Sequence, residues 1–376
     1  MTTKTPRATR LAKSLLIAAA LGGLSYTQLS AQVSTLRTGR LPNGLTYYIS
    51  RDAGASEGTA HFFLLQNVGA ILEDDKQNGL AHYLEHMAFE ATEHFPGGVM
   101  NYLRTRGLYS FDARTGTDDT RYSIMDVPTT EKGLTDSVLL ILKDWCSGIS
   151  ITEKDTEKQR GIIIEEWRQR GGIDKRLSDS IAGVIYNGSQ YSKRNVIGSL
   201  DVLKTFKYPD IQAFYKTWYR PDLQAVIIVG DVDVNYTEAQ IKKIFADIPA
   251  PVNAAERVYI PVEDNAKPIV GIAADKEATQ NSINISYKAD VTPPNIRATL
   301  MGPLEDYIKS VVTSMIAQRF SDIVKKPNAP FVNASVDFGN YVVAKTKDAV
   351  NFDATFKEGQ WEPALKALVA EIVRLK

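Results

Sequence analysis

The 376-residue sequence is poor in the residue types that most often build reactive sites, with one cysteine and four histidines. A single cysteine excludes an internal disulfide framework and a multi-cysteine zinc cluster. Charge of one sign is also lacking, because 44 Lys and Arg residues balance 44 Asp and Glu residues. Without a basic excess to attract phosphates, we expect no nucleic-acid partner. The 44% of hydrophobic and 23% of charged residues are typical of a globular protein, and the length suits two or three domains.

The sequence has no apolar run long enough to span a bilayer as a helix, which needs about 20 residues. The apolar run at residues 15–24 follows a segment with four basic and no acidic residues, and small and polar residues come after it. This pattern predicts a secretory signal peptide at residues 1–31, and the alternative is an N-terminal membrane anchor. We therefore expect an exported protein, periplasmic or secreted, with no stable membrane insertion after signal cleavage.

The rest of the chain predicts two units and a proline-rich connection between them. Residues 33–247 alternate between short apolar strands and amphipathic helices. Residues 248–265 contain several prolines and are typical of a linker. The pattern restarts at residues 266–376 with a strand, a long helix, two strands and a last helix. This second unit has about half the length of the first. It is either a small domain or the opening of a longer one.

Two of the four histidines, His82 and His86, lie in one short segment, residues 81–87, which reads AHYLEHM. Side chains four residues apart project from the same face of a helix, so both imidazoles can bind one metal ion. Glu85 flanks that face and is placed to contact a metal-bound water rather than the metal. This HxxEH order is the inverzincin signature of zinc peptidases. The alternative is two surface histidines on a helix with an incidental glutamate.

A catalytic zinc ion needs a third protein ligand, and the other two histidines lack a paired spacing, so a carboxylate is the natural candidate. The helix expected at residues 152–170 carries two adjacent candidates, Glu165 and Glu166. Neighbouring helical residues point about 100° apart, so only one of them can face inward. Glu166 shares a stripe with Gln159 and Ile162, and we expect it to be the third ligand.

Several segments resemble a known family. Residues 79–98 (GLAHYLEHMAFEATEHFPGG) resemble the core motif of the M16 (pitrilysin-like, insulinase) metallopeptidases, and residues 159–167 (QRGIIIEEW) are similar to that family's downstream ligand segment. The segments at 191–194, 214–221 and 229–231 resemble later landmarks of the family's first domain. The resemblance covers residues 35–245 strongly, and residues 266–376 resemble the opening of the family's second, sequence-divergent repeat.

The resemblance implies an α+β fold of the M16 type, an α/β sandwich with helices on one face of a mostly antiparallel sheet. A catalytic domain at 33–247 would be followed by the start of a second homologous domain. Paired halves would enclose a peptide-binding chamber, with the second half on the same chain or on a partner chain. His82, His86 and Glu166 would hold Zn²⁺, with Glu85 as general base on zinc-bound water. The substrate would be a peptide or an unfolded polypeptide.

Two positions depart from the family's pattern. Gln159 occupies the position, seven residues before the ligand glutamate, where the family usually has an acidic residue. A carboxylate that supports the metal ligands is therefore missing or supplied otherwise. The strand that aligns the substrate usually carries an Asn-Ala pair, whereas this chain has Asp112, Ala113 and Arg114 there. A carboxylate at position 112 accepts hydrogen bonds but cannot donate one to a scissile carbonyl as an amide can.

Three functions remain open from the sequence. The leading hypothesis is an exported zinc endopeptidase that degrades peptides or unfolded chains. The second is a catalytically silent M16-like partner or scaffold subunit that supports an active sibling. The intact set of His82, Glu85 and His86 argues against this second function, whereas Gln159 and the short second unit argue for it. The third is a metal-dependent binding module without catalysis.

Overall fold

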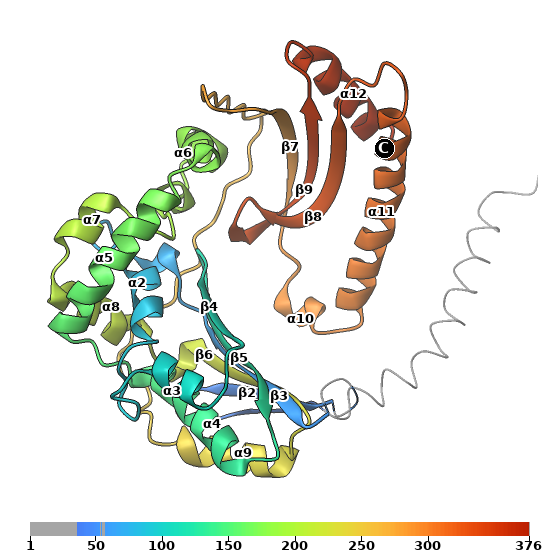
Figure 1. Cartoon of the computed structure of the whole chain (residues 1–376). Helices are drawn as coiled ribbons and strands as arrows, with labels where there is room; N and C mark the ends of the chain where they lie inside the picture. The colour runs from blue at the N-terminus through green and yellow to red at the C-terminus, as the bar shows by residue number, and fades with distance from the viewer. Residues whose placement is uncertain (1–35, 53, 55–56, 376) are drawn as a thin grey trace, which may run out of the picture.

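The structure, a computed structural model, describes residues 36–375 except 53, 55 and 56, so the expected signal peptide lies outside the described residues. Two β-sheets form in this part of the chain, each with helices packed against it (Figure 1). We refer to residues 36–248 as the first unit and to residues 281–373 as the second unit.

The first unit is built on a six-stranded sheet with the order β1-β2-β6-β3-β5-β4. Neighbouring strands are antiparallel except β2 and β6, which are parallel. Buried and half-buried residues alternate along β3 and β6, as expected of strands with one face on the core. β4 lies at the edge of the sheet, so its outer side pairs with no further strand of this sheet. The strands are β1 (Leu36–Arg40), β2 (Thr46–Arg51), β3 (Thr59–Gln66), β4 (Phe111–Thr115), β5 (Thr120–Pro128) and β6 (Gln224–Gly230).

Helices cover one face of this sheet (Figure 1). They are α2 (Leu80–Met87), α3 (Val99–Thr105), α4 (Lys132–Ser147), α5 (Glu153–Gln169), α6 (Ile173–Ile185), α7 (Leu200–Thr205), α8 (Tyr208–Trp218) and α9 (Val234–Ile244), with 3-10 turns at Ala70–Leu72, Gln190–Lys193 and Pro221–Leu223. Trp145 of α4 is fully buried and donates its indole N–H to the Ala88 carbonyl at 2.8 Å, which ties the end of α2 to the core. The predicted α+β fold, with helices on one face of a mostly antiparallel sheet, is confirmed.

The second unit is smaller and carries a three-stranded antiparallel sheet with the order β7-β9-β8. Its elements are β7 (Asn281–Ala289), α10 (Pro294–Arg297), α11 (Met301–Val324), β8 (Asn333–Tyr341), β9 (Ala344–Phe356) and α12 (Trp361–Val373). Its core is separate from that of the first unit and includes Phe320, Val336, Phe352 and Leu368. Residues 245–280, which contain the expected linker, form neither helix nor strand.

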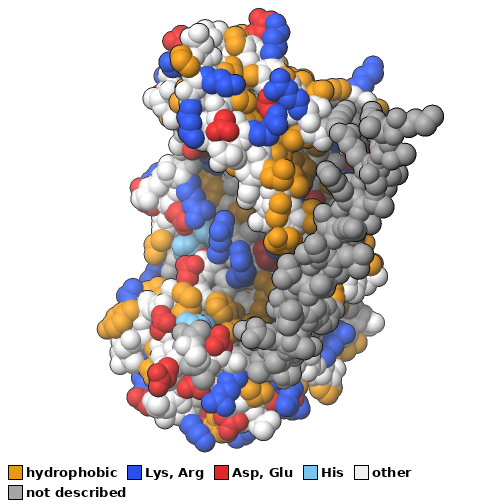
Figure 2. All heavy atoms as spheres, turned by 90° about the vertical axis from the view of Figure 1, so that its right-hand side faces the viewer, with side chains coloured by type: hydrophobic (Ala, Val, Ile, Leu, Met, Phe, Trp, Pro, Cys, Tyr) orange, Lys and Arg blue, Asp and Glu red, His pale blue; other side chains and the backbone are white. Residues whose placement is uncertain are grey.

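The long helix α11 is apolar on two sides. Ile316 and Phe320 pack into the core of the second unit. A stripe on the outer side is exposed and is visible as a hydrophobic band in Figure 2; it consists of Leu300, Leu304, Tyr307, Ile308, Val311 and Met315. Among the described residues, neither α11 nor any other helix is long and apolar enough to cross a bilayer.

A buried aspartate holds the two units together. Asp118 lies in the turn between β4 and β5 and is 3% exposed. Its carboxylate accepts hydrogen bonds from the Tyr191 hydroxyl at 2.9 Å and from the backbone N–H of Lys345 at 3.3 Å. The Arg257 guanidinium lies 3.4 Å away. Because Arg257 belongs to the connection and Lys345 to β9, Asp118 joins the first unit, the connection and the second unit.

Candidate metal and catalytic site

The helix that carries the two histidines is fixed at its N-terminus by a buried carboxylate. Gly79, with φ of 112°, precedes α2 in the left-handed region that favours glycine. The Glu73 carboxylate accepts the backbone N–H groups of Gly79 and Ala81 at 2.9 and 2.8 Å. Glu73 is 2% exposed, and burial raises its pKa to about 8 although these two N–H groups act in the opposite direction. The first turn of α2, from which His82 projects, is therefore held in place.

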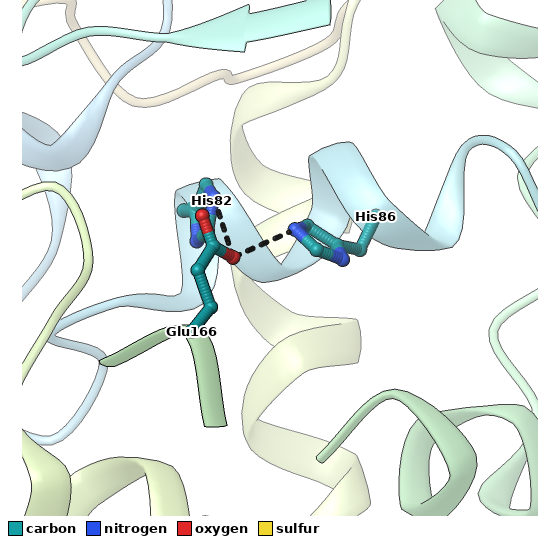
Figure 3. A group of neighbouring side chains, drawn as sticks. All are labelled: His82, His86 and Glu166. Atoms are coloured by element: carbon teal, nitrogen blue, oxygen red, sulfur yellow. Dashed lines mark ion pairs between the residues drawn. The ribbon is translucent and has the colours of Figure 1, made fainter. Parts of the chain in front are cut away.

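Helix α5 brings Glu166 to both histidines. The Nε2 atoms of His82 and His86 face the same oxygen of Glu166, Oε2, at 3.7 and 3.3 Å (Figure 3). The three candidate ligand atoms all lie within 4.8 Å of one another. Two donor atoms bound at about 2.1 Å to a tetrahedral ion are separated by about 3.4 Å, so this spacing fits zinc. Glu165, the other candidate, is exposed and pairs with Arg168 at 3.0 Å.

The environment of the candidate ligands favours the state that metal binding needs. His82 is 3% exposed, and burial lowers its pKa to about 3, with His86 and Arg170 adding to the effect. A neutral imidazole has a free lone pair for a metal. Among the described residues, the buried His82 Nδ1 has no hydrogen-bond partner. Arg170 binds the second carboxylate oxygen of Glu166 at 2.5 Å, which leaves Oε2 facing the imidazoles.

Glu85 is held by one residue of β4. Its Oε2 accepts the backbone N–H of Thr115 at 2.7 Å and the Thr115 hydroxyl at 2.5 Å. The side chain is buried, and burial raises the pKa of Glu85, whereas the hydrogen bonds from Thr115 lower it. Within the described residues, Oε1 accepts no hydrogen bond and stays available for a proton. The arrangement suits a general base of fixed orientation beside the two histidines.

The candidate substrate strand lies on β4, next to Thr115. Because Thr115 directs its N–H to Glu85 rather than to β5, the backbone groups of Ala113, two residues earlier, also point to the outer edge. The side chain of Ala113 packs against the core, whereas Asp112 and Arg114 are exposed. By the alternation of a strand, these two side chains lie on the face opposite to that of Thr115. Ala113 thus offers backbone groups near Glu85, and the Asp112 carboxylate points elsewhere.

Gln159 contacts one of the candidate ligands directly. It is 6% exposed, and its Oε1 lies 3.2 Å from Nδ1 of His86. Its Nε2 donates to Oε1 of Glu90 at 2.6 Å. Lys158 donates to both oxygens of Glu90 at 2.7 Å. A carboxylate is therefore present near His86, but it belongs to Glu90 and reaches His86 only through the Gln159 amide.

Three residues of this site were not identified from the sequence: Glu73, Glu90 and Thr115. The charge run at residues 73–76 is typical of a solvated segment, but the Glu73 carboxylate is buried and caps α2. Nothing in the sequence distinguishes Glu90 from other helix-end glutamates. Thr115 could have been identified from the sequence. It lies two residues after Ala113 on the expected substrate strand, and alternate residues of a strand share a face.

A second group of metal-ligand residue types, Glu93, His94 and Asp144, is satisfied by protein contacts. The fully buried Asp144 accepts the backbone N–H of His94 at 2.8 Å and lies 2.7 Å from its Nδ1. Lys143 pairs with Glu93 at 2.8 Å. These contacts anchor the loop after α2, so the group has a structural role.

In Figure 2 the surface is hollowed between the two units, and histidine, Lys and Arg side chains line the hollow. The connection and Asp118 set the position of the second unit across this hollow from the first.

Sequence comparisons match the chain to two family models. The model described as Insulinase (Peptidase family M16) matches residues 52–191, and the model described as Peptidase M16 inactive domain matches residues 205–302. The probable zinc protease PqqL of Escherichia coli (strain K12) is 28% identical over 375 residues, which is 98% of this chain and 38% of that protein. A zinc protease PQQL-like protein of Arabidopsis thaliana is 30% identical over 307 residues, 79% of this chain and 31% of that protein.

Comparison with solved structures finds a relative that the sequence comparison also finds. The crystal structure of the first half of the periplasmic protease PqqL from Escherichia coli aligns with a TM-score of 0.78 and 26% identity, covering 90% of this chain and 71% of that chain. The chain spans 38% of the length of the full Escherichia coli relative. The first family model includes His82, Glu85, His86 and Glu166. The motifs, the fold and these matches agree, and the chain belongs to the M16 family of peptidases.

Proposed function

We propose that this chain carries the zinc-binding and catalytic site of an M16 endopeptidase that hydrolyses peptides or unfolded polypeptides. The observation that supports this most directly is the convergence of His82 Nε2, His86 Nε2 and Glu166 Oε2, at 3.3–3.7 Å. Glu85 lies next to His86 in the chain and is held by Thr115. The names of the relatives as zinc proteases add support for the choice of metal.

Each side chain has a defined task in this proposal. His82, His86 and Glu166 hold the metal, and bound zinc supplies Lewis acidity and lowers the pKa of water at the site to about 7. Glu85 takes the proton of the attacking water on Oε1 and returns it to the leaving amine. Thr115 fixes Oε2 of the same carboxylate, so the proton acceptor keeps one orientation.

The substrate is placed by the edge of the sheet. An extended peptide adds as a further strand along the outer side of β4 and pairs with the backbone groups of Ala113. Backbone pairing of this kind tolerates many sequences, because main-chain groups are common to all peptides. Asp112 and Arg114 are exposed beside this edge and are placed to contact the side chains of the bound peptide.

The organisation and location of the whole protein follow from the same reasoning. We infer that residues 33–247 are the catalytic domain, 248–265 a linker and 266–376 part of a second M16-like domain. A second M16 half, on the same chain or on a partner chain, completes the substrate chamber. The expected signal peptide at residues 1–31 and the periplasmic location of a structural relative, the protease PqqL, support an exported protein.

The test separates metal binding from catalysis. Zinc content is measured by elemental analysis, and hydrolysis is followed with an internally quenched, unstructured peptide. Glu85→Gln should keep about one zinc per chain and lose about 10²–10⁴-fold in hydrolysis. His82→Ala and Glu166→Gln should lose zinc, whereas Glu165→Gln, the matched control, should keep both zinc and activity.

Two results would contradict the proposal. Full activity of the Glu85→Gln protein would refute the general base, and zinc retained by Glu166→Gln but lost by Glu165→Gln would refute the ligand set. A protein that binds zinc and leaves the peptide intact, with its second half present, would be the silent partner or a metal-dependent binding module instead.

A further inference from the structure

The hydrogen-bonding chemistry of Glu90 fixes the orientation of the Gln159 amide. A carboxylate accepts hydrogen bonds and cannot donate them, and an amide has one donating and one accepting end. Lys158 binds both oxygens of Glu90 at 2.7 Å, which favours the ionised carboxylate. At the 2.6 Å contact between Glu90 and Gln159, the amide must therefore present its NH₂ group. The reverse orientation would place two oxygens against each other.

The orientation of the amide in turn fixes the tautomer of His86. With its NH₂ group on Glu90, Gln159 presents its carbonyl oxygen to Nδ1 of His86 at 3.2 Å. A carbonyl oxygen only accepts, so Nδ1 carries the proton. The lone pair of the neutral ring is then on Nε2, the atom that faces Glu166.

We propose that Glu90 and Gln159 form a positioning pair that holds His86 in the Nδ1–H tautomer, with Nε2 free to bind metal. The link to metal rests on the proposed function, whereas the tautomer itself does not. Here the imidazole N–H of His86 faces the neutral amide of Gln159 instead of a carboxylate. The Glu90 carboxylate contacts the other end of that amide and sets its orientation. Groups that orient a metal-binding histidine in this way change metal affinity by about 10–100-fold when they are removed.

The pair predicts how exchanging the carboxylate and the amide between positions 90 and 159 affects His86. Glu90→Gln removes the group that selects the amide direction, because two facing amides can pair in either sense. Gln159→Glu restores a carboxylate on His86 but places it against the Glu90 carboxylate. The double variant Glu90→Gln/Gln159→Glu again alternates donor and acceptor, since the new amide donates to the new carboxylate. Each single change should therefore disturb His86, and the double change should repair it.

The first measurement is the tautomer of His86 in the metal-free protein, from long-range ¹H–¹⁵N correlation spectra at a pH where imidazole is neutral. The chain has only four histidines, and His86→Gln identifies the signal by its loss. We expect a protonated Nδ1 and an unprotonated Nε2 in the wild type and in the double variant, and a mixture of tautomers in Glu90→Gln. A wild-type ring protonated on Nε2, or an unchanged spectrum of Glu90→Gln, would overturn the pair.

The second measurement is zinc affinity by competition with a chelator. Glu90→Gln and Gln159→Glu should each weaken binding about 10–100-fold, and the double variant should return to within about threefold of the wild type. Glu153→Gln, an exposed glutamate in the first turn of α5, the helix that carries Gln159, is the matched control and should leave both readouts unchanged. Additive losses in the double variant would overturn the pair. If the wild type binds no zinc, the proposed function fails, while the tautomer result stands or falls by itself.

Discussion

Thr115 offers a sharp test of how Glu85, the proposed general base, is held, because it supplies both hydrogen bonds to Glu85 in the described structure. The Thr115→Val substitution keeps the size and branching of the side chain and removes only the hydroxyl donor. The backbone N–H of residue 115 remains on Oε2 at 2.7 Å, while the 2.5 Å bond from the hydroxyl is lost. The carboxylate is then held by one donor instead of two and can turn about it.

The expected size of the effect follows from the energy of such a bond. A hydrogen bond to a charged group contributes about 1.5–3 kcal/mol, and each 1.4 kcal/mol corresponds to about a factor of ten. If that energy serves to hold Glu85 in its working orientation, Thr115→Val should lower kcat/KM by about 10–100-fold. The loss should appear in kcat, since Thr115 acts on the base. Zinc content should stay the same because the Thr115 hydroxyl donates to Glu85, which is not one of the three candidate ligands.

The matched control is Thr115→Ser, which keeps the hydroxyl and loses a methyl group. Peptide hydrolysis, zinc content and thermal unfolding are measured on the wild type and both variants. We expect Thr115→Ser to stay within about threefold of the wild type in kcat/KM. Equal losses in both variants would show that packing, not hydrogen bonding, is what matters. Full activity of Thr115→Val would refute the role of the hydroxyl.

Two further predictions concern stability. The pKa of Glu73 is raised from 4.5 to about 8, so the stability it contributes is complete below about pH 4.5 and is lost as the pH rises to about 8. The melting temperature of the wild type should therefore fall more over this pH range than that of Glu73→Gln. If the two melting temperatures change with pH in parallel, the raised pKa of Glu73 is contradicted. Asp118→Ala removes the ion-pair partner of the buried Arg257 and the acceptor of the Tyr191 hydroxyl, and should lower the free energy of unfolding by about 3–5 kcal/mol in denaturant titrations, with faster proteolysis of the connection. Asp119→Ala, the control on the same turn, should cost about 1 kcal/mol or less, since Asp119 pairs with a lysine that is half exposed.

The sequence predicts the parts of this molecule whose pattern is local. Thr152 was expected to begin a helix, and its hydroxyl accepts the N–H of Asp155 as the N-cap of α5. The helical phase of α5 separates Glu165 from Glu166, and in the structure only Glu166 faces the histidines. These features depend on spacing along one helix, which the sequence contains directly.

Contacts between elements could not be predicted in the same way. Helix α2 ends at Met87, and the chain beyond it places Glu90 against α5. No periodicity specifies that contact, because it joins residues 69 positions apart. The same is true of Thr115 and Glu85, which are 30 positions apart on a strand and a helix. Residue types and spacing predict which side chains share one face of a helix or strand. Only the packed structure shows which residues that face contacts.

The short length of α2 explains why so many buried polar contacts surround it. It has eight residues, and an isolated helix in water needs about 12–15 to be even marginally stable. Its position must therefore come from tertiary contacts: Glu73 at the first turn, the Tyr83 hydroxyl on the Thr156 carbonyl, and Thr115 on Glu85. Each of these joins α2 to a different segment of the chain. Two histidines one turn apart keep a fixed separation only while that turn is intact, so these contacts act on the candidate metal site through the helix that carries His82 and His86.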